Sequence, residues 1–283
     1  MRILLTNDDG VGAPGIAVLA RALTDWIDRG PSNEIREVVI VAPDVNYSGM
    51  SAAVGDVFDH PSVRYRRHRI AGAEGIPTYG LEAPPALCAL LGALGSFDHQ
   101  PDLVLSGINA GANVGRSVLH SGTVGAVLTA AQLGLSGMAI SVQWGEDVHY
   151  DTAAAVAVEV LEELMNAPSR TLFNLNVPNL PAAALRGVRR GRISTAGVVK
   201  SAGPRAGGEP LAEEGDLPLR LGAASPQLGD VSDEAPDDDG ALLAAGYASL
   251  TPLRGPHEDT DTALDGPMAR ALGAISRHLE TYR

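Results

Sequence analysis

The chain opens Met1-Arg2-Ile3-Leu4-Leu5-Thr6-Asn7-Asp8-Asp9-Gly10, and this stretch predicts the fold. Residues 3–6 form a short apolar run, which is typical of a buried strand in a parallel sheet. The following stretch, from Gly15 to about residue 27, has the apolar spacing of a helix. A buried strand that leads through a polar turn into a helix is the first unit of an α/β domain.

The same alternation of strand and helix continues to about residue 180. We expect strands at 37–42, 103–106, 138–142 and 172–177, an edge or hairpin strand at 62–70, and helices at 86–94, 123–133 and 151–165. Asp151 is the expected N-cap of the last of these helices. The pattern predicts an α/β fold with a doubly wound, mostly parallel (Rossmann-like) sheet that is covered by helices on both faces.

The composition changes after Pro178, where Pro, Gly and Ala dominate. Residues 187–200 and 247–253 contain strand-like pieces, and residues 261–282 have helical spacing. Between Glu209 and Asp239 there are ten acidic residues and one basic residue, without periodicity. We therefore expect a Rossmann-like catalytic domain at 1–180, a β-rich extension for oligomerisation at 181–255 and a C-terminal helix at 256–283. The extension would contain a solvated, mobile acidic loop at about 209–240, whose carboxylates have no fixed geometry.

Charge and composition exclude several classes of protein. The formal net charge of −13 disfavours non-specific binding of nucleic acid. The single cysteine, Cys88, excludes a disulfide within the chain and a cysteine-based zinc site, and its apolar neighbours indicate a core position. The first apolar run is too short for a signal peptide, and no later run is long enough to span a membrane. These features favour a cytoplasmic protein without a membrane or nucleic-acid partner.

Three loops rich in oxygen ligands and small residues follow three of the predicted strands. They contain Asp8 and Asp9, then Ser48, then Asn109 with Asn113, and the third continues to Ser121-Gly122-Thr123. Ligands gather beyond the carboxyl ends of the strands in an open parallel sheet, so we expect the three loop tips to meet.

The first tip predicts a metal site. Two adjacent carboxylates are costly unless a positive charge separates them. Asp8 and Asp9 with Ser48 and Asn109 would make an all-oxygen ligand set, which suits Mg²⁺, Mn²⁺ or Ca²⁺ better than zinc. The alternative is that the aspartates only form a turn or cap the next helix.

The turn Ser121-Gly122-Thr123 lies directly before a predicted helix. Its backbone N–H groups, two hydroxyls and positive dipole end could bind a phosphate, although an ordinary N-cap has the same sequence. His120 adjoins the turn and is a weak candidate for acid–base chemistry or phosphate contact, or else polar lining of the site. Metal and phosphate sites together indicate a metal-dependent phosphatase.

A competing motif begins in the first loop. Gly10, Gly12 and Gly15 match the G-x-G-x-x-G pattern of a dinucleotide-binding turn, with Asp44 at the end of the second strand as the acid for the ribose. Two features count against an NAD(P)-binding oxidoreductase. Asp8 and Asp9 would face the pyrophosphate, and Asp44 lies further from Gly15 than the roughly 20 residues expected.

Taken together, the loops resemble the SurE (survival protein E) family of 5′/3′-nucleotidases. The matching stretches are 3–10 with 13–15, 41–43 with 48–49, 106–111 with Asn113 and Gly115, 121–124, 174–178, 246–247 and 251–253. The resemblance implies a Rossmann-like sheet, a C-terminal β extension used in dimer or tetramer contacts, and hydrolysis of nucleoside 5′-monophosphates, with 3′-monophosphates as a further substrate class.

By the same resemblance, Asp8, Asp9, Ser48 and Asn109 would hold one divalent cation per subunit, Mg²⁺ or Mn²⁺, with Ca²⁺ as a substitute in crystals. Asn113, Ser121, Gly122 and Thr123 would receive the phosphate of the nucleotide. Asp8 and Asp9 would be the catalytic residues of a 5′-nucleotidase or acid-phosphatase-like hydrolase, with in-line attack by water and Asp9 as the better-placed base. The stretch 83–88 lacks the Thr and Asp that are usual in the family. This departure keeps a second alternative open, a catalytically weak SurE-like binding protein.

Overall fold

The computed structural model describes residues 1–29, 37–57, 59, 61–97, 100–195, 199–200, 220–221, 235–256 and 266–270. The chain divides into two compact units, Met1–Leu253 and Arg254–Arg283, and each is described by itself. In the second unit residues 266–270 are helical, and the rest of the predicted C-terminal helix lies outside the described residues. Most of the predicted acidic loop at 209–240 also lies outside them.

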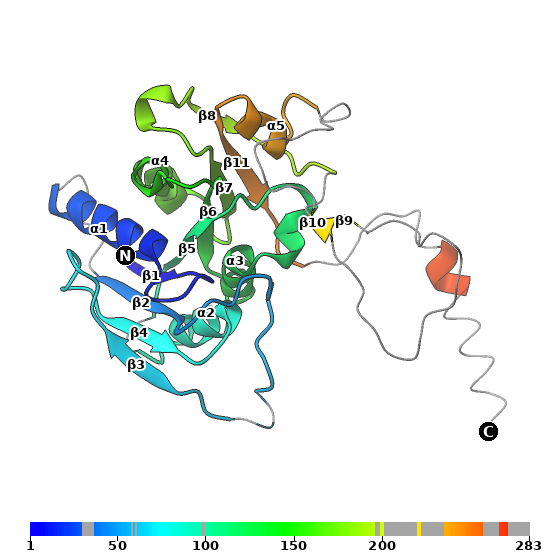
Figure 1. Ribbon diagram of the computed structural model, residues 1–283. Coiled ribbons are helices and arrows are strands. Elements are labelled where there is room, and N and C mark those ends of the chain that lie inside the picture. Colours follow the sequence, from blue (N-terminus) through cyan, green and yellow to red (C-terminus); the bar gives the residue numbers. More distant parts are fainter. Residues whose placement is uncertain are drawn as a thin grey trace, which may run out of the picture. The chain divides into compact units, whose positions relative to one another are not determined.

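Strands from the described residues of the first unit form a nine-stranded sheet (Figure 1). Its order is β3 (Tyr65–His68), β4 (Thr78–Leu81), β2 (Glu37–Pro43), β1 (Arg2–Thr6), β5 (Leu103–Ala110), β6 (Ser136–Val142), β7 (Leu172–Val177), β11 (Ala248–Leu253) and β8 (Val188–Arg190). The block from β4 to β7 is parallel, whereas β3 is antiparallel to β4 and β11 is antiparallel to β7. The predicted mostly parallel α/β sheet is confirmed. Since β2, β1 and β5 are parallel neighbours, their carboxyl ends lie at the same sheet edge.

Helices cover both faces of the sheet: α1 (Pro14–Arg29) and α4 (Tyr150–Asn166) one face, α2 (Pro85–Ala93) and α3 (Gly122–Gln132) the other. Successive side chains of β1 pack against opposite faces of the sheet. Ile3 belongs to the core cluster that contains Leu19 and Leu161, and Leu4 belongs to the cluster that contains Val127. Full burial of each such side chain contributes about 1.5–3 kcal/mol. Among the described helices, none is long and apolar enough to cross a membrane.

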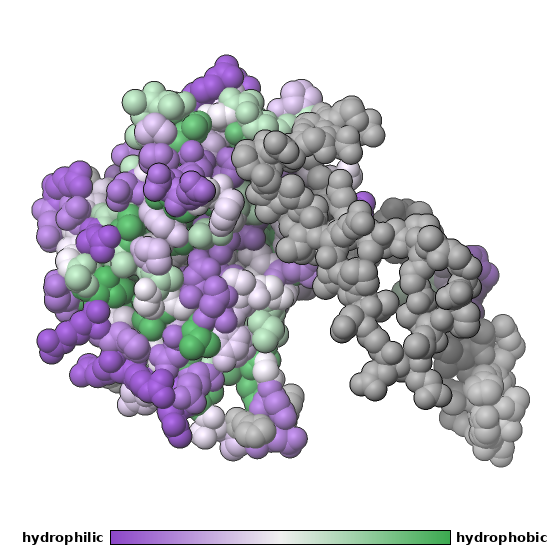
Figure 2. Space-filling view, in the orientation of Figure 1, coloured by the Kyte–Doolittle hydropathy of each residue, from purple (hydrophilic) through white to green (hydrophobic). Residues whose placement is uncertain are grey.

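The β3 edge of the sheet combines a predicted strand with one that was not predicted. Residues 62–70 were expected to contain an edge strand, and β3 forms there with all four residues exposed. The surface over it is hydrophilic (Figure 2), and charged side chains on an edge strand discourage pairing with another chain. Its partner β4 was missed because it has only four residues, one of them a glycine.

The predicted N-cap of α4 is wrong. The helix begins at Tyr150, and His149 occupies the cap position without a side-chain cap hydrogen bond. Asp151 lies inside the first turn, where its carboxylate still interacts favourably with the helix dipole. The preference for Asp at the cap placed the N-cap two residues late and the start of the helix one residue late.

The C-terminal extension adds β8 and β11 to the sheet next to β7, and it also contains η2 (Ala182–Ala184) and α5 (Asp239–Ala244). β9 (Val199–Lys200) and β10 (Arg220–Leu221) form a separate two-stranded sheet. One expectation about the acidic stretch is wrong at its end: Asp239 is fully buried and hydrogen-bonded rather than solvated. Asp237 and Asp238 also have fixed partners, Arg192 and the N–H of Ala235.

Candidate active site

Asp8 joins the loop after β1 to the loop after β2 and to the start of α3. The backbone N–H of Tyr47 donates to the backbone oxygen of Asp8 at 2.8 Å. The hydroxyl of Thr123 donates to Asp8 Oδ1 at 2.6 Å, and Asp8 is only 3% exposed. Three segments that are far apart in the sequence therefore meet at one buried residue.

Asp9 contacts the loop after β5. The backbone N–H of Ala110 donates to Asp9 Oδ2 at 3.3 Å, and Asn46 Nδ2 lies 3.5 Å from Asp9 Oδ1. Burial raises the pKa of the Tyr150 hydroxyl, and the charge of Asp9 raises it further. The first residue of α4 thus borders the site, which the sequence reasoning did not foresee.

Ser48 and Asn109 lie on the loops that contact the aspartates. Ser48 follows the residue whose N–H binds the Asp8 backbone, and its own N–H donates to Asn46 Oδ1 at 2.8 Å. Asn109 precedes the residue whose N–H binds Asp9, and its side-chain nitrogen donates to the backbone oxygen two residues on at 2.6 Å. The loops meet as expected, and a cation shared by all four side chains stays a prediction.

Two glycines permit the close approach of these elements. A Cβ on Gly15 in α1 would lie 1.9 Å from the backbone oxygen of Ile108 in β5. A Cβ on Gly125 in α3 would lie 2.1 Å from the backbone oxygen of Ser51 in the loop after β2. Both obstacles are backbone atoms, so a larger residue would push apart the elements that carry the site.

The chemistry of the aspartate pair fits a divalent cation. Burial raises the pKa of Asp8 from 3.8, against the hydrogen bonds from Thr123 and its neighbours. Burial also raises the pKa of Asp9, and the charge of Asp8 adds to that increase. No basic side chain in the described part of the chain forms an ion pair with either aspartate. A bound cation would offset both the burial of the two carboxylates and the repulsion between them. Carboxylate, hydroxyl and amide oxygens are hard donors of the kind that Mg²⁺ and Mn²⁺ accept.

Such a cation would need ligands besides carboxylates. Among the described residues, no three His, Cys, Asp or Glu side chains come together as a metal-binding group. The site therefore depends on the uncharged oxygens of Ser48 and Asn109, or on water, to complete the coordination.

The start of α3 already holds an anion, namely Asp8. The backbone N–H groups of Gly122 and Thr123 form hydrogen bonds to the Asp8 carboxylate, which lower its pKa. Ser121 Oγ accepts from the Val124 N–H at 3.1 Å, so Ser121 is an N-cap as well as a candidate phosphate ligand. The helix terminus attracts anions, as expected, but in this structure the first anion is a side chain of the chain itself.

Asn174 and Asn176 of β7 hold Asn113 in place. In the sequence they stand out only as part of the stretch 174–178 that carries the family resemblance. The N–H of Asn113 donates to Asn176 Oδ1 at 2.7 Å, and its backbone oxygen accepts from Asn174 Nδ2 at 2.8 Å. Its side-chain nitrogen donates one hydrogen to Ser141 Oγ at 2.9 Å, and no described residue accepts the second amide hydrogen. The alternation of two asparagines in the apolar strand β7 is the sequence signal that could have revealed this group.

The remaining candidates have different surroundings. His120 is exposed, and its backbone oxygen accepts from the N–H of Ser51 at 3.2 Å, which connects the second and third loops. Cys88 is fully buried, and burial raises the pKa of its thiol well above the ordinary value. The predicted core position of Cys88 is confirmed.

Comparison with known proteins identifies the family. A family model described as Survival protein SurE matches residues 3–199. The chain belongs to the SurE family. Two relatives named 5′/3′-nucleotidase SurE are each 38% identical to it: one from Cronobacter sakazakii over 259 residues, covering 89% of this chain and 90% of the relative, and one from Serratia proteamaculans over 256 residues, covering 90% of each. The crystal structure of the SurE protein from Aquifex aeolicus matches with a TM-score of 0.70 and 28% identity, covering 96% of this chain and 100% of that chain.

In this SurE-family chain, the groups required for dinucleotide binding have other partners. The Val11 N–H donates to the Pro43 backbone oxygen at 2.7 Å, inside the glycine-rich turn. Asp44 is paired with Arg66 and with His68, whose Nε2 lies 3.1 Å from Asp44 Oδ1. Asp44 is therefore not free to bind a ribose.

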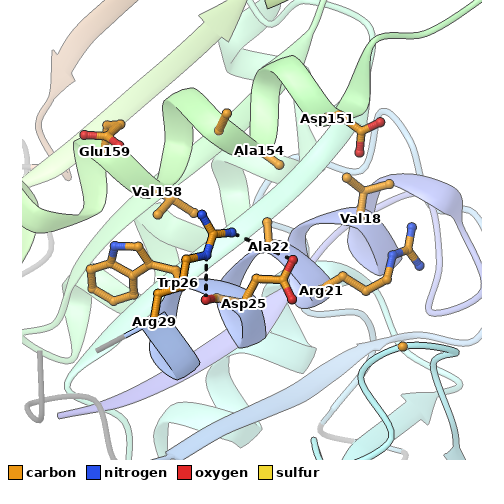
Figure 3. Close-up of a pocket in the computed structure, with 12 residues that line it drawn as sticks. Val18, Arg21, Ala22, Asp25, Trp26, Arg29, Asp151, Ala154, Val158 and Glu159 are labelled. Atoms are coloured by element: carbon orange, nitrogen blue, oxygen red, sulfur yellow. Dashed lines mark hydrogen bonds and ion pairs between the residues drawn. The ribbon is translucent and has the colours of Figure 1, made fainter. Parts of the chain in front are cut away.

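A groove of about 590 Å³ lies between α1 and α4 (Figure 3). Trp26, Val158 and Asp151 line it, and Arg29 donates to the backbone oxygen of Asp25 at 3.1 Å. None of the predicted metal or phosphate ligands lines this groove, so it is separate from the candidate active site.

The raised pKa values give an expected pH dependence for cation binding. When the pKa of a carboxyl group is higher in the folded than in the unfolded chain, ionisation of that group lowers the free energy of unfolding. This loss of stability begins as pH rises above the unfolded-state pKa and is complete above the folded-state pKa. Without a cation, ionisation of Asp8 and Asp9 should therefore destabilise the fold as pH rises above about 4. The increase in Tm caused by Mn²⁺ should be larger at pH 7 than at pH 5.

Thermal unfolding of the wild type and of Asp9→Asn, each with Mn²⁺ and with EDTA, checks this expectation. Other carboxylates ionise in the same range, so the difference between the two proteins isolates the pair. A Mn²⁺ concentration 100 times the Kd would stabilise the wild type by about 2.7 kcal/mol. A Mn²⁺ effect that is the same at both pH values, or the same in both proteins, would contradict the assignment.

Proposed function

We propose that this SurE-family chain is a phosphomonoester hydrolase that releases phosphate from nucleoside 5′-monophosphates, and from 3′-monophosphates as a second class, with the help of a divalent cation. The observation that carries the proposal is the meeting of Asp8 and Asp9 with two further loops and the start of α3. The relatives named 5′/3′-nucleotidase support the substrate class.

Asp8, Asp9, Ser48 and Asn109 are the residues that would hold the cation. When bound, Mg²⁺ or Mn²⁺ supplies Lewis acidity toward the phosphoryl oxygens. Asp8 is fixed by Thr123 and the α3 backbone, so it contributes a carboxylate of defined orientation. Because these side chains are preorganised, little rearrangement is needed as charge develops in the transition state.

Asp9 is the proposed base. Without a cation, burial and then the charge of Asp8 raise its pKa. Asp9 is also more exposed than Asp8, so a water molecule reaches its carboxylate more easily. Attack by water in line with the ester bond forms one P–O bond, breaks the P–O bond to the nucleoside and passes one proton of the water to Asp9. The leaving nucleoside oxygen takes up a proton from solvent, so that nucleoside and phosphate are released. The second amide hydrogen of Asn113 and the hydroxyl hydrogen of Ser121 would donate to the equatorial phosphoryl oxygens.

A panel of phosphomonoesters assayed with Mg²⁺, with Mn²⁺ and with EDTA tests the proposal. We expect phosphate release from nucleoside monophosphates that falls at least about tenfold in EDTA and returns when the cation is restored. Release that is insensitive to EDTA would contradict the cation dependence.

Two further outcomes would favour the alternatives. Saturable NAD(P) binding without a cation would favour the oxidoreductase. Binding of Mn²⁺ or of a nucleotide without turnover would favour a SurE-like binding protein. Either result would overturn the proposed hydrolase.

A further inference from the structure

A buried carboxylate of the C-terminal extension lies against the loop that carries Asn113. Asp239 is 0% exposed. Both of its side-chain oxygens accept from the N–H of Gly115, Oδ1 at 3.1 Å and Oδ2 at 3.0 Å. The two residues are 124 positions apart, so this contact connects the extension to the loop after β5.

Among the described residues, the groups that donate hydrogen bonds to the Asp239 side chain are backbone N–H groups. Oδ1 also accepts from the N–H of Ser194 at 3.2 Å and from the N–H of Gly240 at 2.9 Å. In the described part of the chain no basic side chain pairs with Asp239. A buried carboxylate without a cationic partner is costly, and here the hydrogen bonds from the N–H groups of Gly115, Ser194 and Gly240 offset that cost. An apolar residue at this position would leave these N–H groups without an acceptor. The position therefore calls for a carboxylate for a reason other than packing.

Gly115 stands between two groups that are proposed to bind phosphate. It has a φ of +54° and begins η1 (Gly115–His120), which leads directly to Ser121 at the start of α3. Two residues before it, Asn113 is fixed to β7 through Asn174 and Asn176. Asn174 and Asn176 fix the backbone of this turn at Asn113, and Asp239 fixes it at Gly115.

We propose that Asp239 is a positioning residue for the phosphate site. It fixes the Gly115 turn so that Asn113 on one side and the Ser121-Gly122-Thr123 turn on the other serve the same phosphoryl group. In the described part of the chain Asp239 has no hydrogen bond to the proposed cation ligands, and it would act only through the backbone of the turn. The inference rests on the proposed function, because it assigns the phosphate contacts as that function does.

The variant Asp239→Asn tests the role, with Asp237→Asn as the matched control. Asparagine has the size of aspartate but replaces one acceptor oxygen by a donor that opposes the backbone N–H groups. Asp237 is exposed, and its ion pair with Arg192 is long, at 3.7 Å. The measurements are KM and kcat for a nucleoside monophosphate, the Kd of inorganic phosphate, and the Kd of Mn²⁺.

For Asp239→Asn we expect KM and the phosphate Kd to rise roughly 10- to 100-fold, because a small displacement of positioning groups has effects of that size. The Mn²⁺ Kd should change less than about twofold, since the cation ligands lie on other residues. Asp237→Asn should match the wild type in every constant. A merely structural role would lower Tm and leave KM and the phosphate Kd unchanged, and that result would overturn the inference.

Phosphate binding separates this inference from the proposed function. A wild type that binds phosphate without hydrolysing nucleotides contradicts the function, and the effect of Asp239→Asn on phosphate binding still decides the inference. If Asp239→Asn does not fold, hydrogen exchange in the wild type replaces it. The Gly115 amide should then exchange slowly, and exchange as fast as an exposed loop amide would overturn the proposal.

Discussion

Asp9→Asn is expected to lower kcat for a nucleoside monophosphate by roughly 10²- to 10⁴-fold while the fold is kept. The substitution removes a proposed base and one of the two carboxylates of the cation site. It also removes the repulsion between the charges of Asp8 and Asp9, which helps to raise the pKa of Asp9 in the wild type. In EDTA the variant should therefore be at least as stable as the wild type at pH 7. Steady-state kinetics with Mn²⁺ and thermal unfolding in EDTA measure the two effects.

Asp25→Asn is the matched control for this variant. Asp25 is exposed on α1, and its ion pair with Arg29 is 3.9 Å long, so it contributes little to stability. The control should keep kcat within about twofold of the wild type. If Asp9→Asn did the same, Asp9 would be neither base nor essential cation ligand.

Gly15→Ala is expected to destabilise the fold by about 3 kcal/mol or more. The new methyl group would lie 1.9 Å from the backbone oxygen of Ile108, so α1 and β5 would have to separate. Because Asn109 follows Ile108, the same displacement should weaken the cation site. Urea unfolding and the Kd of Mn²⁺ measure these two consequences.

The same glycine-rich turn offers a control in Gly12→Ala. A Cβ on Gly12 would meet nothing within 4 Å, and its φ is not in the left-handed region. Its stability should change by less than about 0.5 kcal/mol. Equal stability of the two variants would show that α1 can withdraw from β5 without cost, and would contradict the close packing described here.

The strands at the centre of the parallel sheet could be predicted, because a strand that is buried on both faces is apolar along most of its length. β1 and β2 are nearly unbroken apolar runs, and the run of β1 belongs to two core clusters at once. β4 has no such run, because Tyr79 and Gly80 interrupt it. α5 was missed because it begins inside an acidic stretch without helical periodicity.

The site was predictable where function requires several polar residues in one loop. Asp8 with Asp9 and the Ser-Gly-Thr turn are dense local signals, and the parallel sheet explains why their loops meet. Single residues such as Tyr150 and Asp239 have no local sequence pattern that marks them, since their surroundings come from segments that are far away in the sequence. The sequence placed Asp239 among solvated carboxylates, whereas three backbone N–H groups hold it in the interior.

Titration of Mn²⁺ into the wild type and into Asp9→Asn is the most direct test of a shared cation at the aspartate pair. The wild type should bind one Mn²⁺ ion per chain, and Asp9→Asn should bind it at least about tenfold more weakly, since a buried carboxylate ligand is lost. Equal Mn²⁺ affinity in the two proteins would contradict the account, because the cation would then lie elsewhere in the chain.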